Sequence, residues 1–366
     1  MTIRTPRVRG TLLAAVLVLI LTACSSASGS EGSTVTASGG SASCLPADTP
    51  VITLAAYSNP YDAYGKLTSS SGTFGTDWKD KHDQSLIFQM SFGGSTTQAQ
   101  NIVNGFPADI FAASTATDVE MVQRAGLITH DWQNDPDGSV VATSVVGFMV
   151  RPGNPKGIHD WSDLTRPGVQ ILTPDPAQSG GARWNIVAAY GAAMRGKVAG
   201  YAANSSSDAE KLLEGIFENV TVLDKSANDS FKNWASGNGD VAITYENQAL
   251  AGLASGTEGE FVIPSSTVLI QTPTVVVDKN AEAHCNTDVV DAFVKYLHSP
   301  DAQSIFQSVG YQRPIGLADA QKGNPPEYPA IKDLFTVDDL GGWDQLVNDT
   351  VFGPNGAFTT AQKAVS

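Results

Sequence analysis

Cysteine, histidine and positive charge are all scarce in this 366-residue chain, and each shortage argues against a class of function. The three cysteines and five scattered histidines show none of the spacings of a zinc site. Lysine and arginine total 22 against 37 acidic residues, so the formal net charge is −15. Nucleic-acid binding depends on cationic groups that neutralise phosphates, so an acidic chain is a poor candidate for it. We therefore expect no bound metal, no other cofactor and no nucleic-acid partner.

Apolar runs long enough to cross a bilayer are also missing. The longest such stretch covers about ten residues, 12–21, whereas a membrane-spanning helix needs about 20. Three arginines precede this stretch and small residues follow it, which is the order of regions in a signal peptide. We expect residues 1–23 to be such a signal.

The end of this segment carries a second signal. Leu21-Thr22-Ala23-Cys24 resembles the lipobox of bacterial lipoproteins, in which the cysteine receives the lipid and becomes the new N-terminus. The alternative is a secretory signal cleaved near Ala23 beside an incidental cysteine. The resemblance implies that Cys24 anchors the chain to the outer, extracytoplasmic face of the cell membrane.

The next segment, 24–43, consists almost entirely of Ser, Gly, Ala and Thr, so we expect a flexible tether. After lipidation of Cys24, two cysteines remain, Cys44 and Cys285. In an oxidising compartment an even pair suggests a disulfide, with two free thiols as the alternative.

From Cys44 onward, about 320 residues alternate between short β-rich runs and segments with helical periodicity. This alternation predicts an α/β fold with largely parallel sheets. The length exceeds what a single hydrophobic core usually serves, so we expect two lobes. The expected strands are 51–57, 86–92, 110–113, 145–150, 169–173, 220–223, 241–245 and 274–277.

Three strand-to-helix junctions have the composition of anion sites: 93–98, 179–181 and 224–228. A helix N-terminus exposes unpaired N–H groups and a partial positive charge, so it binds anions without a cation. In the first junction, Ser95 and Gln98 have the spacing of a capping box. Each junction alone also fits an ordinary helix start, but three in one α/β chain favour an anion-binding protein.

At these residues the sequence resembles the prokaryotic sulfate- and thiosulfate-binding protein family. The resemblance runs over about 51–352, nearly the whole chain after the tether. Its most specific block is Ser179-Gly180-Gly181-Ala182-Arg183-Trp184-Asn185, and it continues in 150–156, 160–164, 166–168, 239–241, 246–247, 297–300 and 341–343.

The resemblance implies a type II periplasmic-binding fold, in which two α/β lobes are joined by two crossing strands and hold the ligand between them. We expect the crossings near 145–150 and 269–276. The first lobe (lobe I) then combines 44–145 with 272–366, and the second (lobe II) is 146–271.

The resemblance also implies the ligand set. The family holds a dehydrated anion with hydrogen-bond donors only, and Arg183 supports the site from behind the Ser-Gly-Gly loop. Tyr245 stands where the family has an indole donor, so its contact with the ligand is an expectation particular to this chain. The expected donors are the backbone amides of Asn59, Ser95, Gly180, Gly181 and Ala227, the Ser179 hydroxyl and Tyr245.

The function implied is capture of sulfate outside the cytoplasm, as a monomer, for the permease subunits of an ABC importer. Thiosulfate, or another tetrahedral oxyanion such as molybdate, is the alternative ligand. An enzyme acting on anionic esters is the competing class, but Ser179 lacks a Gly-x-Ser-x-Gly elbow and no histidine lies near any expected donor in sequence. We expect no catalytic residue.

Overall fold

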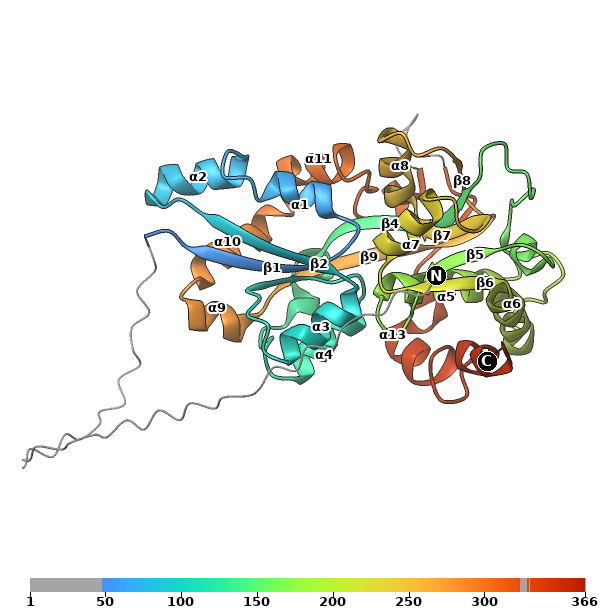
Figure 1. Ribbon diagram of the computed structural model, residues 1–366. Helices are drawn as coiled ribbons and strands as arrows, with labels where there is room; N and C mark the ends of the chain where they lie inside the picture. The colour runs from blue at the N-terminus through green and yellow to red at the C-terminus, as the bar shows by residue number, and fades with distance from the viewer. Residues whose placement is uncertain (1–47, 323–327, 329, 366) are drawn as a thin grey trace, which may run out of the picture. The chain divides into compact units, whose positions relative to one another are not determined.

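Two strands of eleven residues connect the two lobes in the computed structural model, which describes residues 48–322, 328 and 330–365 (Figure 1). β4 (Val140–Val150) and β9 (Ser266–Val276) pair antiparallel over their middle parts. Beyond this pairing, β9 continues into the sheet of lobe I beside β3, and β4 continues into the sheet of lobe II beside β7. The strand order is β2-β1-β3-β9-β4-β7-β5-β6. The predicted α/β fold of two lobes is confirmed, and both crossing strands are longer than the sequence indicated.

In lobe I the parallel strands β1, β2 and β3 lie between two layers of helices. Alternate residues of β1 face opposite layers, as the period of two requires: Ile52 and Leu54 pack toward α1, α2, α10 and α11, and Ala55 packs toward α3 and α4. The elements are β1 (Val51–Tyr57), α1 (Tyr61–Leu67), α2 (Thr73–His82), β2 (Ile87–Gly93), α3 (Ser95–Val103), β3 (Ile110–Ala112), α4 (Ala116–Arg124), η1 (Trp132–Asn134), η2 (Pro136–Ser139), α9 (Asp278–His284), α10 (Thr287–Tyr296) and α11 (Pro300–Ser308).

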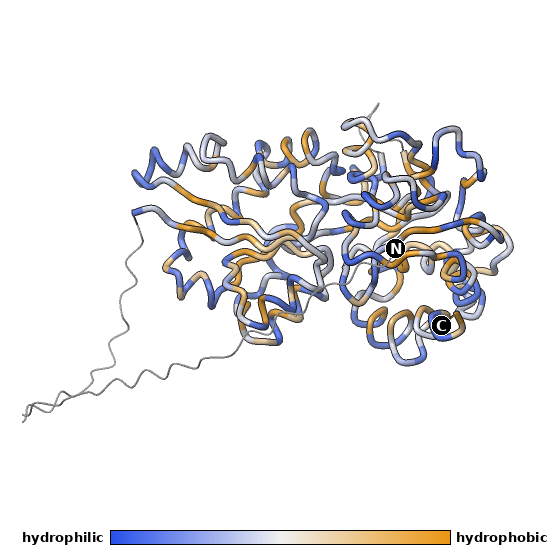
Figure 2. The backbone as a smooth tube through the Cα atoms, viewed as in Figure 1, coloured by the Kyte–Doolittle hydropathy of each residue, from blue (hydrophilic) through white to orange (hydrophobic). Residues whose placement is uncertain are grey.

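Lobe II repeats this plan with parallel pairs β5–β6 and β5–β7. Ile171 of β5 packs toward α5 and α6, and the next residue, Leu172, packs toward α7 and α8. Its elements are η3 (Trp161–Thr165), β5 (Ile171–Pro174), α5 (Gly180–Met194), α6 (Ser206–Glu218), β6 (Val220–Asp224), α7 (Ala227–Ala235), β7 (Val241–Tyr245), α8 (Glu246–Ala254) and β8 (Glu260–Val262), which pairs with β4. In Figure 2, which is coloured by residue hydropathy, hydrophobic residues run along the strands of both lobes, and the helices alternate between hydrophobic and hydrophilic residues.

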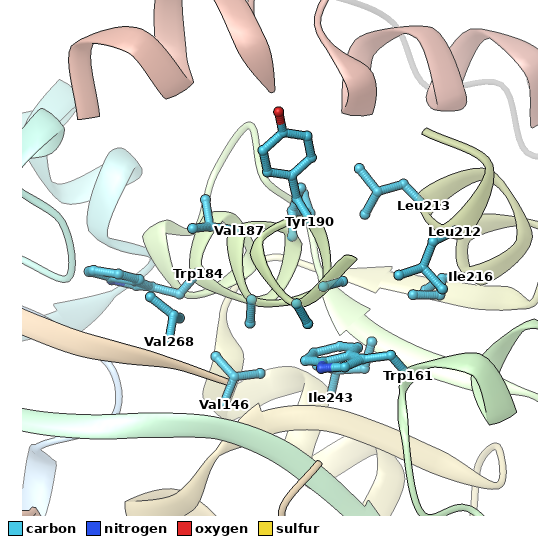
Figure 3. Close-up of a cluster of buried hydrophobic side chains, with 14 of the residues drawn as sticks. Val146, Trp161, Trp184, Val187, Tyr190, Leu212, Leu213, Ile216, Ile243 and Val268 are labelled. Atoms are coloured by element: carbon cyan, nitrogen blue, oxygen red, sulfur yellow. The ribbon is translucent and has the colours of Figure 1, made fainter. Parts of the chain in front are cut away.

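The C-terminal part corrects the predicted boundary that placed 272–366 in lobe I. β10 pairs with the lobe II end of β9, and Phe358 stacks edge-on against Phe217 of α6 at 5.0 Å. Figure 3 shows Tyr190 of α5 pointing away from the sheet, toward the C-terminal helices. Burial of these aromatic side chains on α5 and α6 therefore makes the segment from β10 onward part of lobe II. It contains β10 (Asp333–Phe335), η4 (Asp338–Leu340), α13 (Gly342–Gln345), η5 (Leu346–Thr350) and α14 (Ala357–Val365).

The segment that leads to β10 forms a third connection between the lobes, through α12 (Leu317–Lys322). The backbone N–H of Arg313 donates to the carbonyl of Thr143 in β4, at 3.0 Å. The Arg313 guanidinium also binds the carboxylate of Glu246, the first residue of α8, with one N···O distance of 2.7 Å and both side chains fully buried. This connection was not among the sequence-based expectations.

Among the described residues, none of the helices has both the length and the apolar character needed to cross a bilayer. Cys285 follows α9 and is bonded in a disulfide. Cys24 and Cys44 lie outside the described residues, so the lipid anchor and the pairing of Cys44 with Cys285 stay predictions.

Candidate anion-binding site

A small cavity lies where the two lobes meet, with about 170 Å³ of empty space. No lining residue carries a charge, and most of the lining side chains are buried. Six of the seven predicted ligand residues are among them. The lining consists of Tyr57, Ser58, Asn59, Gly93, Ser95 and Ser114 from lobe I and Ser179, Gly181, Ala227 and Tyr245 from lobe II.

The cavity lies at the carboxyl ends of six strands, three in each lobe. In lobe I the chain reaches it from β1, β2 and β3, and in lobe II from β5, β6 and β7. Parallel strands end at the same edge of a sheet, which is where open α/β sheets bind ligands. The sequence predicted site residues at five of these six strand ends and missed Ser114, which follows the correctly predicted strand β3.

The first turn of α5 begins at the cavity without the usual side-chain cap. Ser179 is its N-cap residue, yet its hydroxyl makes no hydrogen bond to the helix. By contrast, Ser226 caps α7 by accepting from the N–H of Asp229 at 3.1 Å. Since the first N–H groups of a helix have no intrahelical acceptor, the start of α5 leaves both these amides and a hydroxyl available to a ligand.

The predicted capping box at the start of α3 is wrong. Ser95 is the first helical residue, and Gly94 occupies the N-cap position. The Ser95 hydroxyl instead accepts a hydrogen bond from the N–H of Ser114 at 2.8 Å, while the Gln98 amide donates to the carbonyl of Ser91 at 2.9 Å. Tertiary partners have thus replaced the local cap, and the first turn of α3 stays open toward the cavity.

Asn59 brings a side-chain donor in addition to the backbone amide expected from the sequence. Its Nδ2 atom is buried and has no hydrogen-bond partner among the described residues. A buried donor without an acceptor is costly, so such a group at a cavity wall is suited to a ligand that accepts hydrogen bonds. The neighbouring Ser58 hydroxyl accepts from the N–H of Asn228 at 3.3 Å, which joins this loop to α7.

Tyr245 lines the cavity, as predicted, and its hydroxyl oxygen lies 2.7 Å from that of Ser114. Burial raises the pKa of the Tyr245 phenol well above its ordinary value, although the hydrogen bond with Ser114 opposes the shift. The phenol therefore stays protonated at physiological pH and is available as a donor.

The two predicted glycine ligands differ in their surroundings. A Cβ on Gly181 would lie 3.3 Å from both the Ser179 hydroxyl and the Ala227 Cβ, at the cavity wall. A Cβ on Gly180 would instead lie 2.9 Å from a carboxylate oxygen of Asp118, in lobe I. Gly180, which is not among the lining residues, is thus constrained by the approach of the lobes.

Arg183 does not line the cavity. Its guanidinium lies 3.5 Å from Asp118 and 3.1 Å from the Thr117 hydroxyl, so it joins α5 to the first turn of α4. Thr96 of α3 donates to the same Asp118 carboxylate at 2.9 Å. One Asp118 carboxylate oxygen is therefore paired with a cation and a hydroxyl, and the other is buried without a hydrogen-bond partner among the described residues.

The lobes touch closely around the cavity. The N–H of Thr97 in lobe I donates to the carbonyl of Gln178 at 3.2 Å, and the Trp184 indole donates to the carbonyl of Ser114 at 2.6 Å. These contacts, with the burial of the lining side chains, describe a closed arrangement. Within the part of the chain that the structure describes, no group of three His, Cys, Asp or Glu side chains is arranged to hold a metal ion.

The family model and the related sequences that match this chain all belong to one group of binding proteins. The family model described as "Bacterial extracellular solute-binding protein" matches residues 74–312. A sulfate-binding protein of Synechococcus elongatus is 35% identical, over 97% of this chain and 95% of the relative. One from Salmonella typhimurium is 38% identical over 83% and 89%, and a thiosulfate-binding protein of Pseudomonas aeruginosa is 32% identical over 77% and 83%.

The solved structures agree with this result. The sulfate-binding protein SubI from Mycobacterium tuberculosis superimposes with a TM-score of 0.72 at 30% identity, covering 82% of this chain and 99% of that one. A periplasmic thiamin binding protein shares the fold, with a TM-score of 0.61 at 12% identity. With its two-lobe type II periplasmic-binding fold, this chain belongs to the family of bacterial extracellular solute-binding proteins.

Proposed function

We propose that this protein captures sulfate in the cavity between its lobes, outside the cytoplasm, and delivers it to the permease subunits of an ABC importer. The observation that carries the proposal is a buried cavity lined by uncharged hydrogen-bonding groups at the first turns of α3, α5 and α7. Relatives named sulfate-binding proteins, at 35–38% identity over most of the chain, support the choice of anion.

The donors fit a fully deprotonated oxyanion. Sulfate at neutral pH offers only acceptor oxygens, which match backbone N–H groups, the Ser179 hydroxyl and the Asn59 amide. The net charge of the chain is negative, so the attraction must come from these local dipoles and the three helix N-termini. We infer that Asn59, Ser95, Ser179, Gly180, Gly181, Ala227 and Tyr245 form the ligand set.

Phosphate should be rejected by the same pocket. At neutral pH phosphate keeps at least one proton, and a buried O–H without an acceptor costs about 1–3 kcal/mol. Asp62, the carboxylate nearest in sequence to Asn59, is exposed and lines an outer groove beside Tyr61 and Lys66, away from the cavity. The residues that line the cavity include no carboxylate, so none of them can accept the phosphate proton.

We infer a binding protein without catalytic activity. The cavity lining contains no histidine, cysteine, lysine or carboxylate that could act as a general base beside Ser179. The signal peptide, the lipid on Cys24 and the tether 24–43 belong to the same proposal, because a capture protein anchored outside the membrane stays near its permease. We expect the protein to act as a monomer.

Calorimetric titration with sulfate, thiosulfate, molybdate and phosphate tests this function. We expect sulfate to bind most tightly and phosphate to give no measurable heat. Preference for thiosulfate would identify the alternative ligand, for which the Pseudomonas aeruginosa relative at 32% identity gives some support. Phosphate binding comparable to sulfate would contradict the donor-only pocket, and turnover of a sulfate ester would contradict a function limited to binding.

A further inference from the structure

Two hydroxyl groups from different lobes meet at the cavity wall. Ser114 lies between β3 and α4 in lobe I, and Tyr245 ends β7 in lobe II. The two oxygens are 2.7 Å apart, and the two residues are only 1% and 2% exposed. Both residues line the cavity, and neither the family resemblance nor the comparisons assign a role to Ser114.

The protons of this pair can be counted. Each hydroxyl carries one proton and can also accept, so the bond between the two oxygens uses one proton of two. Among the described residues, neither hydroxyl oxygen makes a second hydrogen bond. One proton is therefore left over, and the cavity that both residues line is where a ligand could accept it.

The surroundings hold Ser114 in place for such a contact. Its N–H donates to the Ser95 hydroxyl at 2.8 Å, and its carbonyl accepts from the Trp184 indole at 2.6 Å. Ser95 belongs to the proposed ligand set and Trp184 to the helix α5 that begins at the cavity. The backbone of Ser114 is thus fixed between the two lobes, and its hydroxyl is the part left to the pair.

We propose that Ser114 and Tyr245 act together as one hydrogen-bond donor to the bound anion, which makes Ser114 a ligand-binding residue. This inference rests on the proposed function and adds a specificity-determining pair to it. A hydroxyl that donates to its neighbour strengthens the neighbour's own donation, so the pair is a better donor than one isolated hydroxyl. Because its members come from different lobes, the donor is complete only when the lobes have closed.

A shared donor has a recognisable signature in variants. In Tyr245→Phe the Ser114 hydroxyl keeps its proton and turns it to the anion, and in Ser114→Ala the phenol does the same. Each single variant therefore keeps one donor, and we expect its Kd for sulfate to rise less than about threefold, so that the product of the two single losses stays below the loss in the double variant. The double variant loses a hydrogen bond to a charged ligand, for which a rise of about 10- to 100-fold is expected.

The experiment is a double-mutant cycle followed by calorimetric titration of sulfate into the purified chain and its three variants. The control is a second hydroxyl pair outside the cavity, Tyr64 and Thr274, whose oxygens are also 2.7 Å apart. Tyr64→Phe with Thr274→Ala removes the same groups, so its Kd should equal that of the wild type. Circular dichroism and thermal unfolding verify that all variants fold.

Three outcomes overturn the inference. The first is a double variant with the wild-type Kd. The second is a rise in Kd of the double variant equal to the product of the rises in the two single variants, and the third is a single variant that binds as weakly as the double variant. A wild-type chain that binds thiosulfate but not sulfate contradicts the proposed ligand instead, and the same cycle is then measured with thiosulfate. A wild-type chain that binds none of the four anions overturns both proposals.

Discussion

At the scale of single residues, the site depends on the absence of a side chain at Gly181. The atoms nearest to an added Cβ are side-chain atoms at 3.3 Å. They would have to shift by a few tenths of an ångström, and the backbone could keep its conformation. In the proposed ligand set, the methyl group would nevertheless occupy the space beside the Ser179 hydroxyl that is assigned to the anion. A substitution at this position should therefore weaken binding and leave the fold intact.

We predict that Gly181→Ala raises the Kd for sulfate by at least about tenfold, the equivalent of one hydrogen bond to a charged group. Its thermal midpoint without ligand should stay within a few degrees of the wild type. Gly65→Ala is the matched control, since a Cβ there meets nothing within 4 Å. Calorimetry and thermal unfolding test both variants, and wild-type affinity in Gly181→Ala would place the anion elsewhere.

At the scale of elements, the starts of α3, α5 and α7 must come close together for the lobes to close. Gly94 makes this approach possible, because a Cβ on it would lie 2.4 Å from the carbonyl oxygen of Gln178 and 2.8 Å from that of Lys225. Both contacts are with the backbone of lobe II, which cannot turn aside as a side chain can.

Gly94→Ala should therefore leave each lobe folded and block closure. We expect at least a tenfold weaker affinity for sulfate, because closure brings donors from both lobes to the anion. Small-angle X-ray scattering with and without sulfate measures closure, and the variant should show no ligand-dependent decrease in radius of gyration. If it compacts as the wild type does, closure does not depend on this approach.

The docking of β10 on lobe II depends on an aspartate. Asp333 accepts two hydrogen bonds from Arg195, at 2.8 and 3.0 Å, and one from the Ser266 hydroxyl at 2.6 Å. The Arg195 hydrogen bond is the main cause of a pKa of Asp333 below its ordinary value. A lowered folded-state pKa contributes stability at pH above about 4, which is lost as the pH falls through the folded-state pKa.

Asp333→Asn should lower the free energy of unfolding by about 1 kcal/mol at pH 7, since the ion pair is only partly buried. The difference between wild type and variant should shrink as the pH falls from 5 to about 3. Urea unfolding over this range measures it. A difference that does not change with pH would show that the contact is not linked to the charge of Asp333.

At the scale of the whole molecule, Arg313 joins the third connection between the lobes to the start of α8, next to Tyr245. Both it and Glu246 are fully buried. Removal of one partner leaves a buried charge without its counterion, which costs about 3–5 kcal/mol.

Arg313→Met should therefore destabilise the protein by about that amount. The double variant with Glu246→Gln removes the orphaned charge and should regain part of the loss. Urea unfolding of the wild type and both variants measures these differences. Wild-type stability in Arg313→Met would contradict a structural role for the ion pair.

The sequence by itself determined the fold class, the positions of most strands and most of the residues of the candidate site that line the cavity. Strand boundaries such as those of β1 and β7 follow from local apolar patterns, and the Ser179-Gly180-Gly181 loop is a continuous motif, so both can be read without long-range information. The three helix starts were also visible, because Gly and Ser at strand-to-helix junctions are local signals.

The tertiary structure decided what depends on residues distant in sequence. Ser114 joins the site because its hydroxyl meets that of Tyr245, 131 positions later, and nothing local to Ser114 indicates this contact. Ser95 accepts from Ser114 instead of capping its own helix for the same reason. The C-terminal segment joins lobe II because its aromatic side chains are buried on α5 and α6, and hydrophobic burial depends on which surfaces the fold brings together.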